Sequence, residues 1–257
     1  MPALPFPPPH RHRHRHGLHR RGHPRWARAT APPRHDALSP NAFTLIELMT
    51  TLAIMIVLAS CLLPALHRGK AFAQRAGCQH HLRQWGLATH LYAEGHDDTL
   101  PPEGSPNPTD RHTNVGWYVQ LPRELSLPPY STQPWRTNPL ASIAHAAPWL
   151  CPANRRRSNG RNLFHYCLNQ HLDGTADEDS VTRLASVPRP STLVWLFDSK
   201  NLPAVGPRSY THTNVHGAGA QFLFLDGHVA RFRVESYWDT ARQRPRSEGH
   251  PDLEWEP

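Results

Sequence analysis

Residues 43–66 constrain this chain more than any other segment, because they read FTLIELMTTLAIMIVLASCLLPAL. As a helix they would be about 36 Å long at about 1.5 Å per residue, which exceeds the roughly 30 Å hydrocarbon core of a bilayer. Glu47 is the one charged residue in this run, and a carboxylate inside a membrane segment is costly and usually functional. The run therefore predicts a membrane-spanning helix. It is too long for the apolar core of a secretory signal peptide, and no A-x-A cleavage pattern follows it.

The hexapeptide FTLIEL, residues 43–48, opens this apolar run. It resembles the processing motif of type IV prepilins and of the pseudopilins of type II secretion. The resemblance implies that a prepilin peptidase cleaves between Ala42 and Phe43 and that the new N-terminus is then methylated. Ala42 stands where the family usually has glycine. The resemblance also implies that Glu47 pairs with the α-amine of a neighbouring subunit and sets the assembly register, since opposite charges attract strongly at low dielectric. Pro64 would bend the helix near its far end.

Residues 1–42 differ in composition from the rest of the chain. They contain nine prolines, eight arginines, seven histidines and one acidic residue. Such a segment cannot bury a core, so we expect a disordered basic leader that processing removes. Its alternating histidines and arginines at residues 10–16 could bind a metal in vitro, but they are also typical of a low-complexity tail. The leader has a formal charge of +7, and the remainder, with 20 basic and 19 acidic residues, has +1. The high pI therefore does not indicate that the mature protein binds nucleic acid.

A helical pattern continues beyond the membrane segment. Residues at spacings of four and three predict one buried helical face, and they are Cys78, Leu82, Trp85, Thr89 and Tyr92. Gly95 is a plausible stop, and Pro101-Pro102 forbids continuation. Residues 78–88, with Tyr92 and the Leu-Pro-Pro at 100–102, also resemble a pattern in pseudopilin-like proteins abundant in planctomycete and verrucomicrobial bacteria. We therefore expect residues 67–95 to continue the helix and to pack on a globular head, residues 96–257.

The head is predicted to be small and rich in loops. Residues 103–148 are rich in Pro, Asn, Thr and Ser with interspersed aromatic residues, which indicates loops with at most one short strand. Residues 192–198, TLVWLFD, are typical of a buried strand. Residues 221–225, QFLFL, predict another strand, and Asp226-Gly227 predicts a two-residue type I′ turn that returns the chain through residues 228–234.

His216 precedes Asp226 with nine residues between them, and Gly227 follows. This H-x9-D-G arrangement resembles the signature of a C-terminal domain of prepilin-associated proteins. One interpretation is architectural, with Asp226 making the turn and His216 fixing a loop. The other is a metal site on His216 and Asp226, extended by Asp198 or His228. Calcium prefers oxygen ligands, whereas a histidine suits zinc better, so calcium or zinc in the head is a hypothesis and no cofactor is certain.

Four cysteines allow several arrangements. Cys61 lies in the membrane segment and is expected to stay a free thiol. Cys78, Cys151 and Cys167 would lie outside the cytoplasmic membrane, where a disulfide persists. Three cysteines allow one bridge with one left over, and both Cys151–Cys167 and Cys78–Cys151 remain open because connectivity cannot be deduced from sequence.

Together these features predict an α+β, pilin-like fold, in which a long N-terminal membrane-spanning helix packs on a small antiparallel sheet with loop-rich insertions. The predicted function is a structural subunit and not an enzyme. The resemblance implies prepilin peptidase, other pilin-like subunits and an inner-membrane assembly platform as partners. It also implies a single-pass protein of the bacterial inner membrane, with a cytoplasmic N-terminus and a periplasmic head.

Two other classes of function remain open. One is a signal-anchored envelope protein that uses exposed Trp and Tyr residues to bind a carbohydrate or another ligand. The other is a metal-dependent periplasmic hydrolase built on His216, Asp226 and His228. No nucleophile elbow, paired-carboxylate cleft or phosphate loop in the sequence favours an enzyme.

Overall fold

The computed structural model describes residues 43–104, 115–172, 183–200 and 203–257. The predicted leader, residues 1–42, and the predicted cleavage residue Ala42 lie outside this range. The chain divides into two compact units, Met1–Leu52 and Ala53–Pro257. Helix α1 spans Leu45–Gly95 and begins in the first unit.

The C-terminal part of α1 packs within the second unit along the predicted face. All five residues of that face are buried. The helix ends at Gly95, as predicted, and the chain then turns through Asp97 and Asp98, whose φ values are 51° and 63°. These left-handed conformations let the chain turn back, so that Leu100 is buried in the same core.

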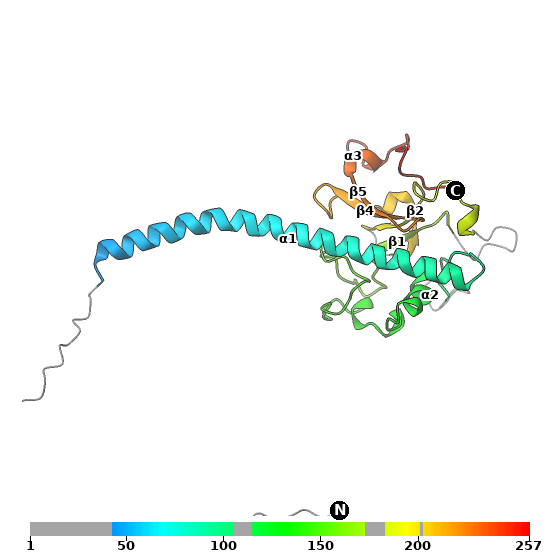
Figure 1. Cartoon of the computed structure of the whole chain (residues 1–257), viewed down its shortest axis with the longest axis horizontal. Helices are drawn as coiled ribbons and strands as arrows, with labels where there is room; N and C mark the ends of the chain where they lie inside the picture. Colours follow the sequence, from blue (N-terminus) through cyan, green and yellow to red (C-terminus); the bar gives the residue numbers. More distant parts are fainter. Residues whose placement is uncertain (1–42, 105–114, 173–182, 201–202) are drawn as a thin grey trace, which may run out of the picture. The chain divides into compact units, whose positions relative to one another are not determined.

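A five-stranded sheet forms the centre of the head (Figure 1). Its strands are β1 (Tyr166–Asn169), β2 (Val194–Asp198), β3 (Val205–Gly206), β4 (Gly219–Phe224) and β5 (Val229–Arg233). The spatial order is β3-β1-β2-β4-β5. Strands β1 and β3 pair in parallel, and the other neighbours pair antiparallel. The predicted α+β class is confirmed at this level, but the sheet is mixed and not wholly antiparallel.

Short elements complete the head. They are α2 (Trp117–Glu124), α3 (Val234–Tyr237), the strand pair β6 (Trp238–Asp239) and β7 (Arg244–Pro245), and 3-10 turns at Tyr130–Thr132, Pro134–Arg136, Leu184–Ser186 and Arg208–Tyr210. Of the segment 103–148, the described residues form α2, two 3-10 turns and loops without a strand. The aromatic residues of this segment are buried, with exposed fractions of 1–4% at Trp117, Tyr118, Tyr130 and Trp135.

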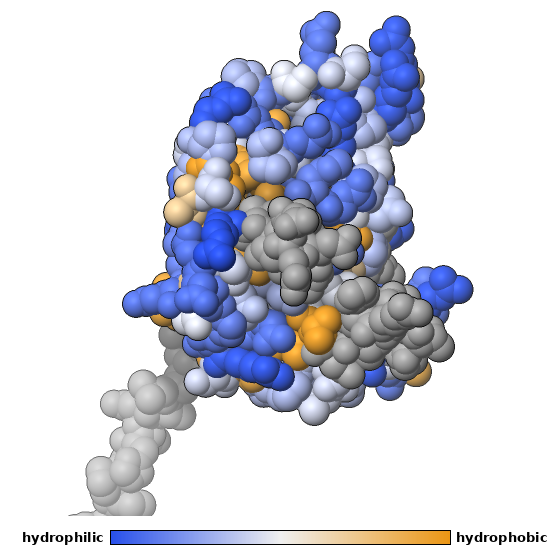
Figure 2. All heavy atoms as spheres, turned by 90° about the vertical axis from the view of Figure 1, so that its right-hand side faces the viewer, coloured by the Kyte–Doolittle hydropathy of each residue, from blue (hydrophilic) through white to orange (hydrophobic). Residues whose placement is uncertain are grey.

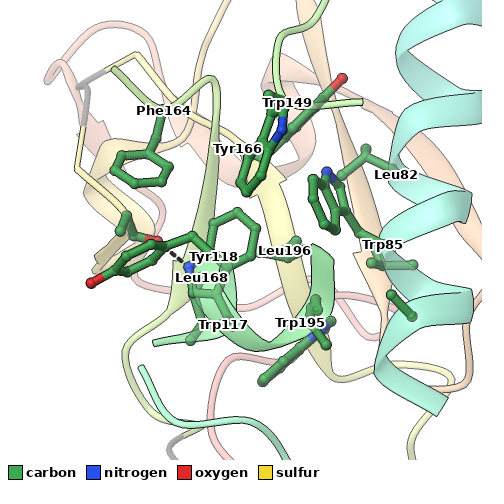
Figure 3. Packing of buried hydrophobic residues seen from close by; sticks show 14 of the residues in the cluster. Leu82, Trp85, Trp117, Tyr118, Trp149, Phe164, Tyr166, Leu168, Trp195 and Leu196 are labelled. Carbon is green, nitrogen blue, oxygen red and sulfur yellow. Dashed lines mark hydrogen bonds between the residues drawn. The ribbon is translucent and has the colours of Figure 1, made fainter. Parts of the chain in front are cut away.

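One face of the sheet and α1 enclose an aromatic core (Figure 3). Leu82 and Trp85 point from α1 into this core, and the Trp85 ring lies 4.8 Å from Trp149 between centroids. The Trp195 indole N–H of β2 donates to the Thr89 hydroxyl at 2.9 Å, and this hydroxyl donates to the Trp85 carbonyl at 2.8 Å. Large aromatic side chains bury much apolar area, and each indole N–H needs a partner when buried. The core therefore fixes α1 against the sheet.

The opposite face of the sheet is covered by the C-terminal segment. Val194, Phe197 and Phe222 pack there with α3 and with Leu253. The buried Asn169 amide of β1 donates to the Val194 carbonyl at 2.9 Å and to the Trp255 carbonyl at 2.8 Å. The C-terminal segment thus completes the core on this face of the sheet.

The β4–β5 hairpin confirms the predicted strands but not the predicted turn. The Gly227 N–H donates to the Phe224 carbonyl, and the Phe224 N–H donates to the His228 carbonyl, both at 3.0 Å. The loop therefore has three residues, and only Gly227 has a positive φ, at 88°. A type I′ turn needs positive φ at both central residues, whereas a type I turn closed by a left-handed glycine needs one. The prediction of a two-residue type I′ turn was wrong.

Candidate functional site

The FTLIEL motif forms the start of α1. The Thr44 hydroxyl and backbone N–H donate to a Glu47 carboxylate oxygen at 2.6 and 2.9 Å, and the Glu47 N–H donates to the Thr44 hydroxyl at 3.3 Å. This reciprocal pattern is a capping box, in which the cap hydroxyl and the glutamate satisfy donors that the helix leaves open. The T-x-x-E spacing of residues 44–47 is a sequence signal for such a cap, which the predictions above did not include. Glu47 therefore has a structural role within its own chain.

The apolar residues that follow have no cover. In the described part of the chain, α1 is the one helix long and apolar enough to cross a membrane, and no residue of its most apolar stretch is buried. Phe43 is 71% exposed. Pro64 lies inside α1, and the helix continues on both sides of it. These observations support the coarse prediction of a single membrane anchor.

His216 and Asp226 lie at opposite ends of β4. His216 precedes the strand, which runs from Gly219 to Phe224, and Asp226 follows it. Six extended residues cover about 20 Å, so these two side chains cannot bind one ion. Asp226 instead accepts hydrogen bonds at its Oδ1 from the His228 N–H at 3.0 Å and from the His228 ring at 2.6 Å. The predicted metal pair His216–Asp226 is therefore wrong.

His216 meets a different carboxylate, Asp198 at the end of β2. The His216 Nε2 lies 3.1 Å from Asp198 Oδ2, and the two side chains are only 1% and 2% exposed. The same oxygen accepts the Gln221 N–H at 2.8 Å. Asp198 Oδ1 is buried without a hydrogen-bond partner among the described residues. Asp198 and His228 had been considered as additional ligands of a metal site. In the structure Asp198 contacts His216, whereas His228 contacts Asp226.

The disulfide joins Cys78 of α1 to Cys151, which lies ahead of β1. Of the two open pairings this is the one present. Cys167 is a free, buried thiol whose pKa is raised well above its usual value by burial, and Cys61 is free and exposed. Cys151 Sγ also lies 3.5 Å from His216 Nε2. The cysteine, histidine and aspartate side chains thus form one buried cluster, to which we refer as the Cys/His/Asp cluster: Cys78, Cys151, Asp198 and His216.

A second buried histidine supports this cluster. The Cys151 N–H donates to His165 Nδ1 at 3.1 Å, so the ring proton is on Nε2, which donates to the Arg156 carbonyl at 3.1 Å. Burial lowers the pKa of His165 from 6.5 to about 4, because the charged ring would lose its hydration and the two backbone hydrogen bonds do not offset that cost. His165 is therefore a neutral structural residue that orients Cys151.

The head also contains a cavity of about 130 Å³ beside α2. Its lining combines aromatic and cationic side chains, among them Tyr118, Tyr130, Arg123 and Arg136. The Arg136 guanidinium lies 5.7 Å from the Tyr130 ring centroid and donates to Asn162 Oδ1. The coloured face of the head in Figure 2 is largely hydrophilic, with small apolar patches.

Comparisons of the chain with protein-family models, with curated proteins and with solved structures give no match.

Proposed function

We propose that this chain is a pilin-like structural subunit, anchored by residues 43–66, processed before Phe43 and assembled with other subunits in the bacterial envelope. The observation that carries the proposal is the FTLIEL motif at the start of a helix whose apolar surface has no cover in the described residues. Such a surface needs either lipid or other apolar helices around it. A pilin-like subunit meets both needs, with lipid before assembly and neighbouring helices afterwards.

The proposed mechanism is polymerisation. Prepilin peptidase would create a free α-amine at Phe43, and an inner-membrane platform would move the subunit from the bilayer into a filament. Glu47 would then exchange its bond to Thr44 for the amine of a neighbouring subunit. A charge pair at low dielectric is stronger than the exposed bonds of a helix cap, so the exchange would favour one axial register.

The other two functions have less support. A hydrolase on His216, Asp226 and His228 would need these side chains in one site, and β4 separates His216 from the other two. An envelope-binding protein cannot use the aromatic residues at 117, 118, 130 and 135 as an exposed surface, since they are buried. This alternative keeps one observation in its favour, the Tyr- and Arg-lined cavity beside α2.

The first experiment is N-terminal sequencing and mass determination on membranes of a host that contains an active prepilin peptidase. A chain that begins at N-methyl-Phe43 is the expected result. An intact chain of 257 residues would contradict processing and would move the envelope-binding protein to first place. Ala42→Gly serves as a control, because it restores the residue that the family usually has before the cut.

A matched pair of variants separates the two roles of Glu47. Glu47→Gln keeps the cap, since glutamine also completes a capping box, but it removes the charge. Thr44→Ala keeps the charge and removes the cap hydroxyl. We expect Glu47→Gln to be processed and anchored but to lose at least tenfold in the filament fraction recovered by shearing and sedimentation, whereas Thr44→Ala should still assemble. If both variants assemble like the wild type, Glu47 is a helix cap only.

A further inference from the structure

The Cys/His/Asp cluster brings side chains from four separate segments to one buried point. Cys78 comes from α1, Cys151 from the loop ahead of β1, Asp198 from the end of β2, and His216 from the loop ahead of β4. The ligating atoms of Cys78, Cys151 and His216 all lie within 4.8 Å of one another. One nitrogen, His216 Nε2, faces both a sulfur at 3.5 Å and a carboxylate oxygen at 3.1 Å. Together with Asp198, these residues offer four donor groups of the kinds that zinc binds.

Two separations at His216 are close to those around a tetrahedral zinc ion. With Zn–S near 2.3 Å and Zn–N or Zn–O near 2.0–2.1 Å, tetrahedral angles require about 3.6 Å between S and N, about 3.3 Å between N and O, and about 3.8 Å between two sulfurs. The observed 3.5 Å from Cys151 Sγ to His216 Nε2 and 3.1 Å from His216 Nε2 to Asp198 Oδ2 are close to these values. For zinc to bind, the bond between Cys78 and Cys151 must be replaced by a wider separation.

A second observation points to a cation at this place. Asp198 Oδ1 is buried and accepts no hydrogen bond from the described residues. A buried carboxylate oxygen without a partner is costly, and a bound cation is one arrangement that would satisfy it. Arg231 lies close by, donates to the carbonyls of His216 and Gly217 and contributes positive charge. That charge offsets a site in which two thiolates and one carboxylate surround a divalent ion.

We propose that Cys78, Cys151, His216 and Asp198 bind Zn²⁺ in the thiol form of the protein, so that the disulfide and the zinc ion are alternative states of one site. A dithiol would supply two electrons and two protons to the disulfide and would itself become a disulfide. The two cysteine thiols would then release their protons to solvent as the thiolates bind Zn²⁺. Zinc prefers this mixture of soft sulfur and imidazole ligands, whereas calcium does not. The proposal does not depend on filament assembly.

The test uses the full chain in detergent micelles, after reduction with dithiothreitol and its removal under argon, with Co²⁺ as a spectroscopic probe for zinc. Tetrahedral Co²⁺ bound to thiolate gives a charge-transfer band that histidines of the leader cannot produce. We expect this band to saturate at one Co²⁺ per chain, to disappear when Zn²⁺ is added, and to be absent in the oxidised protein. His216→Ala and Asp198→Asn should weaken Co²⁺ binding at least tenfold.

Two control variants remove a thiol and a histidine that lie outside the cluster. Cys167→Ser removes a buried thiol outside the cluster, and His228→Ala removes a histidine of the hairpin; both should bind Co²⁺ like the wild type. The absence of a thiolate band in the reduced wild type, or equal bands in the wild type and His216→Ala, would overturn the proposal.

If the reduced chain unfolds without metal, refolding by Zn²⁺ tests the proposal instead. Because ligand deprotonation and folding are coupled to metal binding, Zn²⁺ should then restore the near-ultraviolet circular dichroism of the buried tryptophans. It should do so in the wild type and not in His216→Ala. If Zn²⁺ restores neither protein, or restores both equally, the cluster is only the surroundings of a disulfide.

Discussion

The buried His165 makes the stability of the head depend on pH in a direction that can be calculated. Its pKa is lowered from 6.5 to about 4 in the folded state. Below pH 6.5 the unfolded chain takes up a proton that the folded chain does not, so acid favours unfolding. The stability contribution is therefore fully present above pH 6.5 and is lost as the pH falls towards 4. Between pH 7 and pH 4.5, linkage with these two pKa values gives a loss of about 2.5 kcal/mol.

Other groups also titrate in this range, so the assay compares two proteins. His165→Gln removes the titrating group, while its amide can still accept from Cys151 and donate to the Arg156 carbonyl. Chemical unfolding of both chains in detergent micelles gives the free energy of unfolding at each pH. We expect the advantage of the wild type over His165→Gln to shrink by about 2.5 kcal/mol from pH 7 to pH 4.5.

A surface change controls for the substitution itself. His171→Gln, at an exposed position just after β1, should leave the pH dependence of the wild type unchanged. If the difference between wild type and His165→Gln is the same at both pH values, His165 is not held neutral by burial and the reasoning is wrong.

Two further predictions concern the attachments of α1 and of the C-terminal segment. Replacing Cys78 and Cys151 by serine should lower the free energy of unfolding by about 4.5 kcal/mol, which is the chain-entropy value for a loop with a sequence separation of 73. Denaturant titration of the variant and of the disulfide-bonded wild type measures this difference. A loss below about 1 kcal/mol would contradict the prediction. Asn169→Ala removes the donor to the carbonyls of the buried Val194 and the partly buried Trp255, and should cost about 2–4 kcal/mol. Faster proteolysis of the C-terminal segment should accompany this loss, and Gln170→Ala, at an exposed neighbouring position, should change neither quantity.

The long helix could be predicted because its signals are local. The uninterrupted apolar run, the spacing from Cys78 to Tyr92 and Gly95 all act through neighbouring residues of one helix, and the structure has the helix and the buried face where these signals place them. The same holds for β2 and for the β4–β5 pair. The turn type was predicted wrongly because Asp-Gly occurs in both two-residue and three-residue hairpin loops. The hydrogen bonds of Phe224 show that this loop has three residues.

The Cys/His/Asp cluster could not be predicted in the same way, because its members are far apart in the sequence. Cys78 and His216 meet only after α1 has packed on the sheet and β2 has paired with β4. The sequence suggested Asp198 only as a further ligand of a metal site on His216 and Asp226. The pairing of β2 with β4 joins strands that a long segment separates in the sequence, and no local pattern indicated it.

The spacing of the H-x9-D-G pattern now has a physical explanation. Between His216 and Asp226 the chain makes a turn at Gly217 and Ala218, with φ values of 63° and 55°, and then runs through the six residues of β4. The nine intervening residues are thus the two of this turn, the six of the strand and Leu225. His216 serves the buried cluster at one end, while Asp226 and Gly227 close the hairpin at the other end, so residues that a sequence pattern joins act at two separate places. A change in the length of β4 would disturb both functions together, whereas substitution of either residue alone should affect only its own end.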